Sequence, residues 1–255
     1  MKLFFRRFGQ GFPVIILHGL FGLSDNWVTF GRNLSEHFEI FIPDIRNHGQ
    51  SPHSPVFDFP ALVEDLNEFM EDHNLISPII IGHSLGGKTA MLFALEHPEQ
   101  VKKLIVVDIS LRKYPANQEH QQLINAMLVV DFSQARSRTD VEKQLEGLVE
   151  NEKLRQFLLK NVYWRNKTTL DWRLNLPALN DNLPTLFEGV ITDKQFDKPV
   201  LFIRGGNSRY IMESDYPEIY KKFPQAVITT IPNASHWVHA DAPVEFFRIV
   251  YGFLS

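Results

Sequence analysis

Short, mostly apolar runs recur along the first half of the chain. They are Val14–Leu17, Phe38–Ile42, Ile79–Ile81 and Leu104–Val107. These runs are rich in β-branched residues and are continuous rather than alternating. Such runs are typical of strands buried on both faces, as in a parallel sheet covered by helices.

The segments between these runs have helical spacing. Apolar residues from Phe59 to Met70 recur at steps of three and four, with Pro60 in the first turn. A second helical segment begins at Leu85 and ends before Pro98. This alternation of strands and helices predicts an α/β fold with right-handed crossovers.

The rhythm breaks after Ser110. Residues 111–196 carry helical signals without intervening buried strands, including an inward face that runs from Leu154 to Val162 and a capping-box spacing at Thr139 and Glu142. Strand and helix signals then resume over 199–203, 215–223, 226–231 and 243–253. We therefore predict a core of residues 1–111 and 196–255, with a mostly helical cap of residues 112–195. The cap is inserted after the strand that ends at Asp108.

One motif on this framework carries chemistry. Gly82-His83-Ser84-Leu85-Gly86 lies between a predicted strand and a predicted helix. A sharp strand-to-helix turn leaves no room for Cβ atoms at the two glycines, and it exposes the serine hydroxyl at a helix N-terminus. This context predicts Ser84 as a nucleophile. The alternative is a chance match in a structural loop.

A serine hydroxyl needs a base, which in this topology follows the last strand. His236 lies there, directly before the final helix, and is the predicted base. His239 is the competing candidate, and its alternative role is to begin or cap that helix. His18 and His48 are expected to orient loops around the site, and His83 to pack beside the turn.

An oxyanion formed at Ser84 would need two N–H donors. The backbone N–H of Leu85 is one candidate, because it directly follows the nucleophile. The backbone N–H of Leu20, in the loop His18–Gly22, is the other, and Phe21 beside it is expected to line the substrate pocket. The alternative for this loop is a plain glycine-rich turn.

The acid that would orient the histidine is not at its commonest position. That acid usually follows the penultimate core strand, where this chain has Ser208, which cannot carry the charge. Glu213 and Asp215 come later and are expected to begin the next helix. Asp108 ends the preceding strand on the same edge of the sheet, so we predict it as the acid. Its alternative role is to cap the strand end.

The predicted cap contains aromatic residues that could line the pocket or pack in the cap's own core. They are Tyr163, Trp164, Trp172 and Phe187. Phe187 is our candidate for the pocket.

Composition narrows the chemistry. The chain has 255 residues, 44% hydrophobic, with a net charge of −4, which gives no reason to expect nucleic acid as a partner. It has no cysteine, which excludes thiol catalysis and disulfides. Its histidines lack metal-ligand spacing and its glycines lack nucleotide-binding spacing, so we expect no metal and no cofactor. The absence of a signal-like segment or an apolar run of ~20 residues predicts a cytoplasmic protein without a membrane span.

Several segments together resemble the α/β-hydrolase superfamily and, in detail, the YbfF-type bacterial esterases. They are His18–Gly22, Asp44–Ser51, Gly82–Lys88, Phe157–Lys160, Trp172–Asn175, Gly205–Ser208 and His236–Ala240. The resemblance implies a serine carboxylesterase that hydrolyses short- to medium-chain acyl esters or thioesters through an acyl-serine, without a cofactor. It also supports Asp108 as the acid. Two alternatives remain open: a C–C bond hydrolase, and a ligand receptor or signalling hydrolase with slow turnover.

Overall fold

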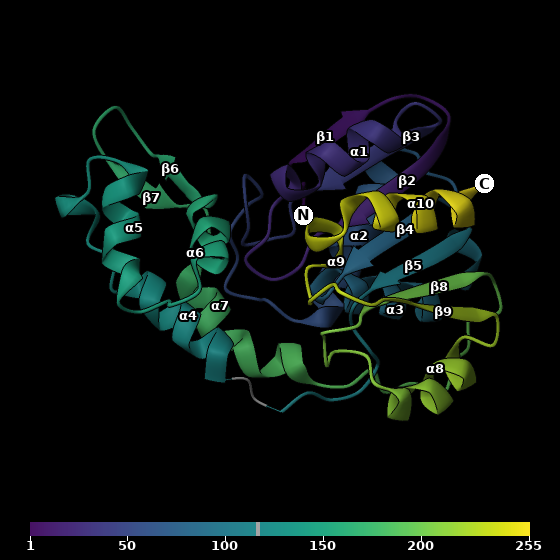
Figure 1. Ribbon diagram of the computed structural model, residues 1–255. Helices are drawn as coiled ribbons and strands as arrows, with labels where there is room; N and C mark the ends of the chain where they lie inside the picture. The colour runs from purple at the N-terminus through teal and green to yellow at the C-terminus, as the bar shows by residue number, and fades with distance from the viewer. Residues whose placement is uncertain (116–117) are drawn as a thin grey trace.

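The computed structural model describes residues 1–115 and 118–255. Within these residues the central sheet has seven strands, in the order β1-β3-β2-β4-β5-β8-β9 (Figure 1). The strands are β1 (Phe5–Phe8), β2 (Phe12–Leu17), β3 (Phe38–Pro43), β4 (Ile79–His83), β5 (Lys103–Val107), β8 (Val200–Gly205) and β9 (Ala226–Ile231). Neighbouring strands run parallel except for the edge pair β1 and β3.

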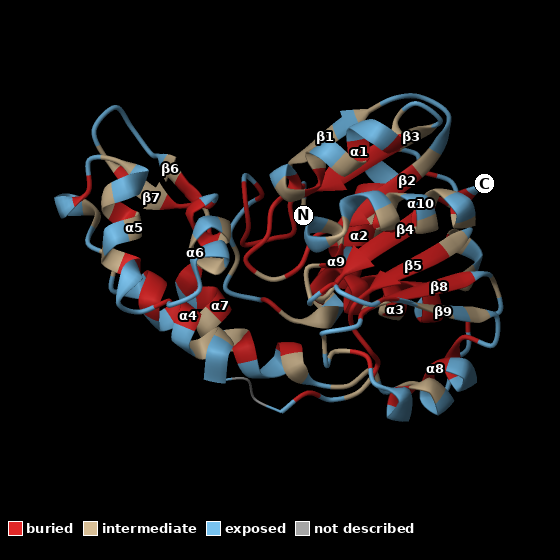
Figure 2. Ribbon diagram, in the orientation of Figure 1, coloured by how far each residue is buried: buried red, intermediate tan, exposed pale blue. Residues whose placement is uncertain are grey.

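Apolar residues cover both faces of this sheet. In β2, Ile15 and Leu17 belong to one buried cluster and Val14 and Ile16 to the other, because side chains alternate along a strand. The first cluster includes residues of α2 (Phe59–Asp72), α3 (Leu85–Glu96) and α8 (Tyr216–Lys222), and the second includes residues of α1 (Val28–Leu34) and α10 (Pro243–Leu254). Figure 2 shows the central strands buried between these layers. The predicted parallel α/β sheet is confirmed.

Between β5 and β8 the chain leaves the sheet and forms the teal and green body at the left of Figure 1. It consists of α4 (Gln118–Leu128), α5 (Arg138–Glu146), α6 (Glu152–Leu159) and α7 (Leu176–Asn182), with a small antiparallel pair, β6 (Val162–Trp164) and β7 (Leu170–Trp172). We call this segment, from α4 to Phe187, the inserted segment.

The inserted segment is fastened to loops at the carboxyl ends of the core strands. A single apolar cluster contains Phe21, Ile45 and Leu85 of the core together with residues of α4 and α7. Beside it, the Asn161 side-chain amide donates to the Phe21 carbonyl oxygen at 2.8 Å. The edge of the sheet that carries the chemical motif is therefore the edge covered by the inserted segment.

Three local predictions were wrong. The edge strand β1 was not expected, because it carries two arginines and none of its residues is fully buried, so it lacks the continuous apolar signal of the inner strands. Val162 does not extend a helix, since it begins β6 and is buried in the cluster shared with α4 and α7. The cap of α5 is Ser137, whose side chain accepts from the Asp140 N–H, rather than Thr139.

Candidate active site

Ser84 lies at the turn between β4 and α3, with φ 52° and ψ −117°. Such left-handed values are rare for a residue with a Cβ atom, and they persist only where the surroundings enforce them. Here the strand and the helix on either side of Ser84 approach so closely that the turn is tightly constrained. A Cβ at Gly82 would lie 2.3 Å from the Gly86 carbonyl oxygen, and one at Gly86 would lie 2.5 Å from that of Leu17. The turn exposes the Ser84 side chain at the N-terminus of α3.

His236 and Asp108 meet from loops that are distant in sequence. Asp108 directly follows β5, and His236 lies between β9 and the short helix α9 (Val238–Asp241). The His236 Nδ1 atom lies 2.8 Å from Asp108 Oδ2. A carboxylate only accepts hydrogen bonds, so Nδ1 carries the proton and donates, which leaves Nε2 free to act as a base.

Asp108 is fully buried and receives two further hydrogen bonds. The Gly205 N–H donates to Oδ1 at 2.9 Å, and the Ser208 hydroxyl donates to Oδ2. Sequence reasoning assigned Ser208 no role beyond its inability to carry the charge. The structure places its hydroxyl directly on the carboxylate that His236 contacts, because the loop after β8 folds over the end of β5.

The other acids weighed from the sequence lie elsewhere. Asp215 is 3.3 Å from Arg112 and accepts a hydrogen bond from the Met212 N–H at 2.8 Å, so it anchors the turn that leads into α8. Glu213 belongs to the same turn. The competing histidine, His239, is stacked on Trp27 with ring centroids 4.1 Å apart.

The two predicted N–H donors border the same space as Ser84. Leu20 and Leu85 both line the pocket into which Ser84 opens. Within the described part of the chain, neither backbone N–H donates to a protein acceptor, whereas the neighbouring Phe21 N–H donates to His48 Nε2 at 3.1 Å.

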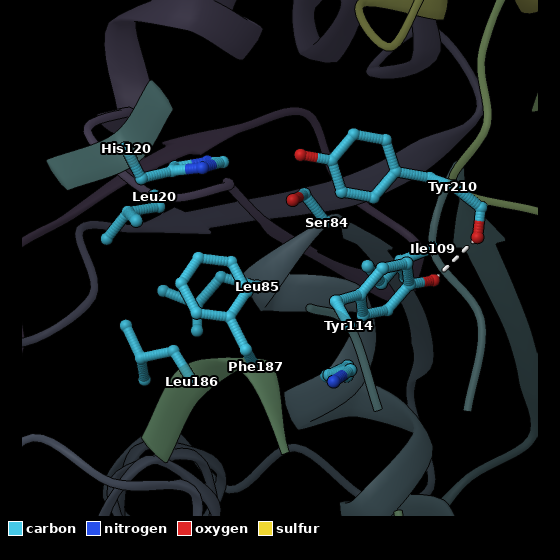
Figure 3. A pocket seen from close by; sticks show the side chains of 10 residues that line it. Leu20, Ser84, Leu85, Ile109, Tyr114, His120, Leu186, Phe187 and Tyr210 are labelled. Atoms are coloured by element: carbon cyan, nitrogen blue, oxygen red, sulfur yellow. Dashed lines mark hydrogen bonds between the residues drawn. The ribbon is translucent and has the colours of Figure 1, made fainter. Parts of the chain in front are cut away.

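The pocket combines core and inserted residues. Figure 3 shows the Ser84 side chain surrounded by the rings of Tyr210, His120 and Phe187, with Leu186 beside Phe187. His120 comes from α4, while Leu186 and Phe187 come from the 3₁₀ helix Leu183–Phe187 that ends the inserted segment. The pocket wall facing the nucleophile is therefore largely apolar and aromatic.

Phe187 lines the pocket that contains Ser84, whereas Phe21 does not. Phe21 is absent from the pocket wall and is 2% exposed, because its backbone adopts φ 60° and its side chain joins the cluster under the inserted segment. Among the other aromatic candidates, Trp172 is buried and donates its Nε1–H to the Met127 carbonyl at 3.0 Å. Trp164 is 51% exposed, and the Tyr163 ring lies beneath the Arg173 guanidinium.

Comparison with known proteins places this arrangement in a family. A family model described as the alpha/beta hydrolase fold matches residues 13–243. The chain belongs to the α/β-hydrolase family. It is a hydrolase, and the resemblance to YbfF-type esterases noted in the motifs is confirmed by the relatives of this α/β hydrolase.

Three of those relatives cover nearly the whole chain. The sn-1-specific diacylglycerol lipase ABHD11 of Danio rerio is 38% identical over 253 residues, which is 97% of this chain and 80% of the relative. Esterase YbfF of Escherichia coli (strain K12) is 34% identical over 95% of this chain and 93% of its own. A solved structure described as a marine microorganism esterase has a TM-score of 0.95 at 41% identity, covering 99% of both chains.

One residue of this hydrolase site was missed by sequence reasoning. Tyr210 stacks on His236 with ring centroids 3.9 Å apart and planes 23° apart. Its backbone is held by the Tyr114 hydroxyl, which donates to the Tyr210 carbonyl oxygen at 2.5 Å (Figure 3). Its place in the sequence, two residues after Ser208, is the only signal that could have suggested it.

Three further histidines support the site as neutral imidazoles. The His83 ring donates to the His236 carbonyl oxygen through Nε2 at 2.9 Å. His18 and His48 each accept a backbone N–H at Nε2, from Ile45 at 2.9 Å and from Phe21 at 3.1 Å. Burial lowers the pKa of His18 to about 4 and that of His48 to about 3, since a charged imidazole would lose its hydration there.

The described residues hold no group of three His, Cys, Asp or Glu side chains arranged to bind a metal ion. Among the helices of the described chain, none is both long and apolar enough to cross a membrane.

The buried histidines predict how stability depends on pH. Their pKa is 6.5 in the unfolded chain but about 4 or 3 in the folded one, so unfolding takes up protons below pH 6.5. Stability should therefore fall as the pH drops from 6.5 toward 4, with each such histidine adding a slope of up to about 1.4 kcal/mol per pH unit.

In urea unfolding at pH 6.5, 5.5 and 4.5, His48→Gln should lose stability less steeply than wild type. The matched change at exposed His37, His37→Gln, should leave the slope unchanged. Parallel curves for His48→Gln and wild type would contradict the assignment.

Proposed function

We propose that this α/β hydrolase is a serine carboxylesterase that cleaves short- to medium-chain acyl esters or thioesters through an acyl-serine intermediate. The observation that carries this function is the 2.8 Å contact between His236 Nδ1 and buried Asp108. Ser84, on its strained turn, donates its N–H at 3.1 Å to the carbonyl oxygen of Val107, the residue before Asp108. Esterase and lipase names among relatives of 34% identity and more support an ester substrate.

In this mechanism Ser84 Oγ attacks the carbonyl carbon of the ester while His236 Nε2 takes the hydroxyl proton. The negative charge that forms on the carbonyl oxygen is stabilised by the N–H groups of Leu20 and Leu85. His236 then gives its proton to the leaving alcohol or thiol, which departs and leaves Ser84 acylated. A water molecule, deprotonated by the same nitrogen, releases the acid and restores the serine. Asp108 stays ionised and stabilises the imidazolium at each step.

We further propose that residues 112–195 act as a cap on a core of residues 1–111 and 196–255, and that the cap shapes the pocket rather than taking part in the chemistry. Two observations support this division of roles. His120, Leu186 and Phe187 of the cap line the pocket, whereas Ser84, Asp108 and His236 all belong to core loops.

The first test of this function is Ser84→Ala. It should abolish hydrolysis of 4-nitrophenyl esters and labelling by a fluorophosphonate while leaving the unfolding curve unchanged, because it removes one hydroxyl. His236→Ala should lower activity by a similar factor, since the triad acts as a unit.

Near-wild-type turnover by Ser84→Ala would remove Ser84 from the mechanism. A larger loss in His239→Ala would transfer the role of base to His239. A single slow turnover with retained product in wild type would favour the receptor alternative.

A second test concerns the acid. Asp108→Asn preserves shape but lets His236 adopt the other tautomer, so kcat should fall by up to ~10⁴-fold. Ser208→Ala leaves the charge and removes one hydrogen bond to it, for which we expect a loss of roughly ten-fold. Asp215→Asn, which perturbs a carboxylate paired with Arg112, should change kcat by less than either. If Asp215→Asn carried the large loss, Asp108 would be structural.

The cap can be tested through chain-length selectivity. Phe187→Ala removes a ring from the pocket wall and so widens the pocket. We measure kcat/KM for the acetate, butyrate, hexanoate and octanoate esters of 4-nitrophenol. The preferred acyl chain should become longer, while kcat/KM for the acetate ester should change least. Trp164→Ala removes an aromatic side chain that is 51% exposed on the same segment and should leave the profile unchanged. Coinciding profiles for Phe187→Ala and wild type would contradict a pocket role.

A further inference from the structure

Lys88 is a buried cation one turn from the nucleophile. It lies in the first turn of α3, where its N–H donates to the Ser84 carbonyl oxygen at 3.0 Å. It lines the pocket and is 1% exposed. The mechanism above does not use it.

The contacts of this ammonium group are neutral. Nζ donates to the Glu188 backbone carbonyl and lies 4.9 Å from the ring centre of Tyr114 and 5.7 Å from that of Phe59. In the part of the chain that the structure describes, no carboxylate lies within ion-pair distance of Nζ. The Glu188 carboxylate itself pairs with Lys113 at 2.7 Å.

A cation in this position is unfavourable for three physical reasons. Burial removes its hydration, the N-terminal turn of a helix repels positive charge, and a second cation, Arg112, lies 4.1 Å from the centre of the same Tyr114 ring. Burial and Arg112 lower the pKa of Lys88 to about 8. Lys222 is a useful contrast. It is also buried, but it ends α8, where the helix dipole stabilises a cation.

We propose that Lys88 binds a carboxylate carried by the substrate, so that the preferred esters of this enzyme are negatively charged close to the scissile bond. The inference rests on the proposed esterase function and specifies its substrate class. A substrate anion in the pocket would form the ion pair that Lys88 lacks among the described residues. Both Ser84 and Lys88 line the pocket, and their backbones lie one helical turn apart at the start of α3. Acyl groups of a few carbons that end in a carboxylate, such as monoesters of glutarate or adipate, therefore serve as probes.

The test compares charged and neutral esters of matched size. Mono-4-nitrophenyl glutarate and adipate place the carboxylate on the acyl side, with 4-nitrophenyl pentanoate and hexanoate as neutral partners. The butyryl esters of 4-hydroxybenzoate and 4-hydroxybenzamide place it on the alcohol side. Turnover by Ser84→Ala serves as the blank and removes spontaneous hydrolysis.

The expected result is a fall of at least ten-fold in the charged-to-neutral ratio of kcat/KM for Lys88→Met, mainly through KM, in one of the two ester sets. The set that responds identifies which side of the substrate carries the charge. Lys88→Arg, which keeps the charge, should retain more of the ratio. Lys113→Met removes an equal charge from an exposed side chain and should leave the ratio unchanged. Equal ratios for Lys88→Met and wild type in both sets would overturn the proposal and leave Lys88 a structural tether to Glu188.

The wild-type enzyme supplies an independent readout should Lys88→Met fail to fold. The charged-to-neutral ratio should fall as the pH rises from 7 to 9.5, because burial lowers the pKa of Lys88 to about 8 and the ammonium charge is lost over this range, while effects common to both esters cancel in the ratio. The charged groups near Lys88 are Arg112 and Glu188, and burial raises the pKa of Tyr114 and lowers that of His120 to about 4. A ratio that stays flat would overturn the proposal. Wild type that cleaves no ester in a Ser84-dependent way would overturn the esterase function itself, whereas Ser84-dependent cleavage without charge preference would overturn only the role of Lys88.

Discussion

The buried carboxylate of Asp108 is the point on which the site depends. A carboxylate without water is costly unless its oxygens are hydrogen-bonded, and here three donors from two stretches of chain satisfy it: Gly205 and Ser208 in one, and His236 in the other. Gly205 ends β8, Ser208 lies in the loop that follows β8, and His236 lies in the loop that follows β9. The requirement to satisfy one charge therefore draws these loops together and holds the His236 ring in one orientation. The Tyr210 ring stacks on the face of the His236 ring and restricts its orientation further.

Around this carboxylate, the same edge of the sheet holds strained and buried polar groups. Ser84 keeps a strained backbone, because the glycines on either side allow β4 and α3 to approach closely. Burial lowers the pKa of His18 and His48 and so favours the neutral imidazole, and Lys88 Nζ donates to the Glu188 backbone carbonyl rather than to a carboxylate of the described chain. Strained backbones and buried ionisable groups lower the stability of the fold, and they cluster at functional sites because they take part in binding or catalysis there. The inserted segment completes the enclosure with an apolar wall that also limits hydration of Lys88.

The sequence was most informative where local and tertiary requirements coincide. Continuous β-branched runs predicted the inner strands because such strands must be apolar on both faces, and the glycine spacing around Ser84 predicted the turn because no other residue fits. Edge strand β1 lacked that signal, since none of its residues is fully buried and it can carry both Arg6 and Arg7. Phe21 was placed in the pocket because it adjoins Leu20, but a side chain's direction depends on its backbone angles and on what packs above it.

What the sequence by itself determined was therefore the α/β sheet and the turn that presents Ser84, and it made Asp108 and His236 the candidates to act with Ser84. These follow from spacing, from strand order and from glycine stereochemistry, all of which are local or periodic. Only the tertiary structure decided that Ser208 and Gly205 donate to Asp108, that Tyr210 covers His236, and that Lys88 donates to a backbone carbonyl rather than to a carboxylate among the described residues. The reason is that each of these contacts joins loops or elements about a hundred residues apart, except the stacking of Tyr210, whose loop is set by its bond to Tyr114. Sequence spacing carries no information on such distances, whereas burial and the need to satisfy charge determine them once the chain has folded.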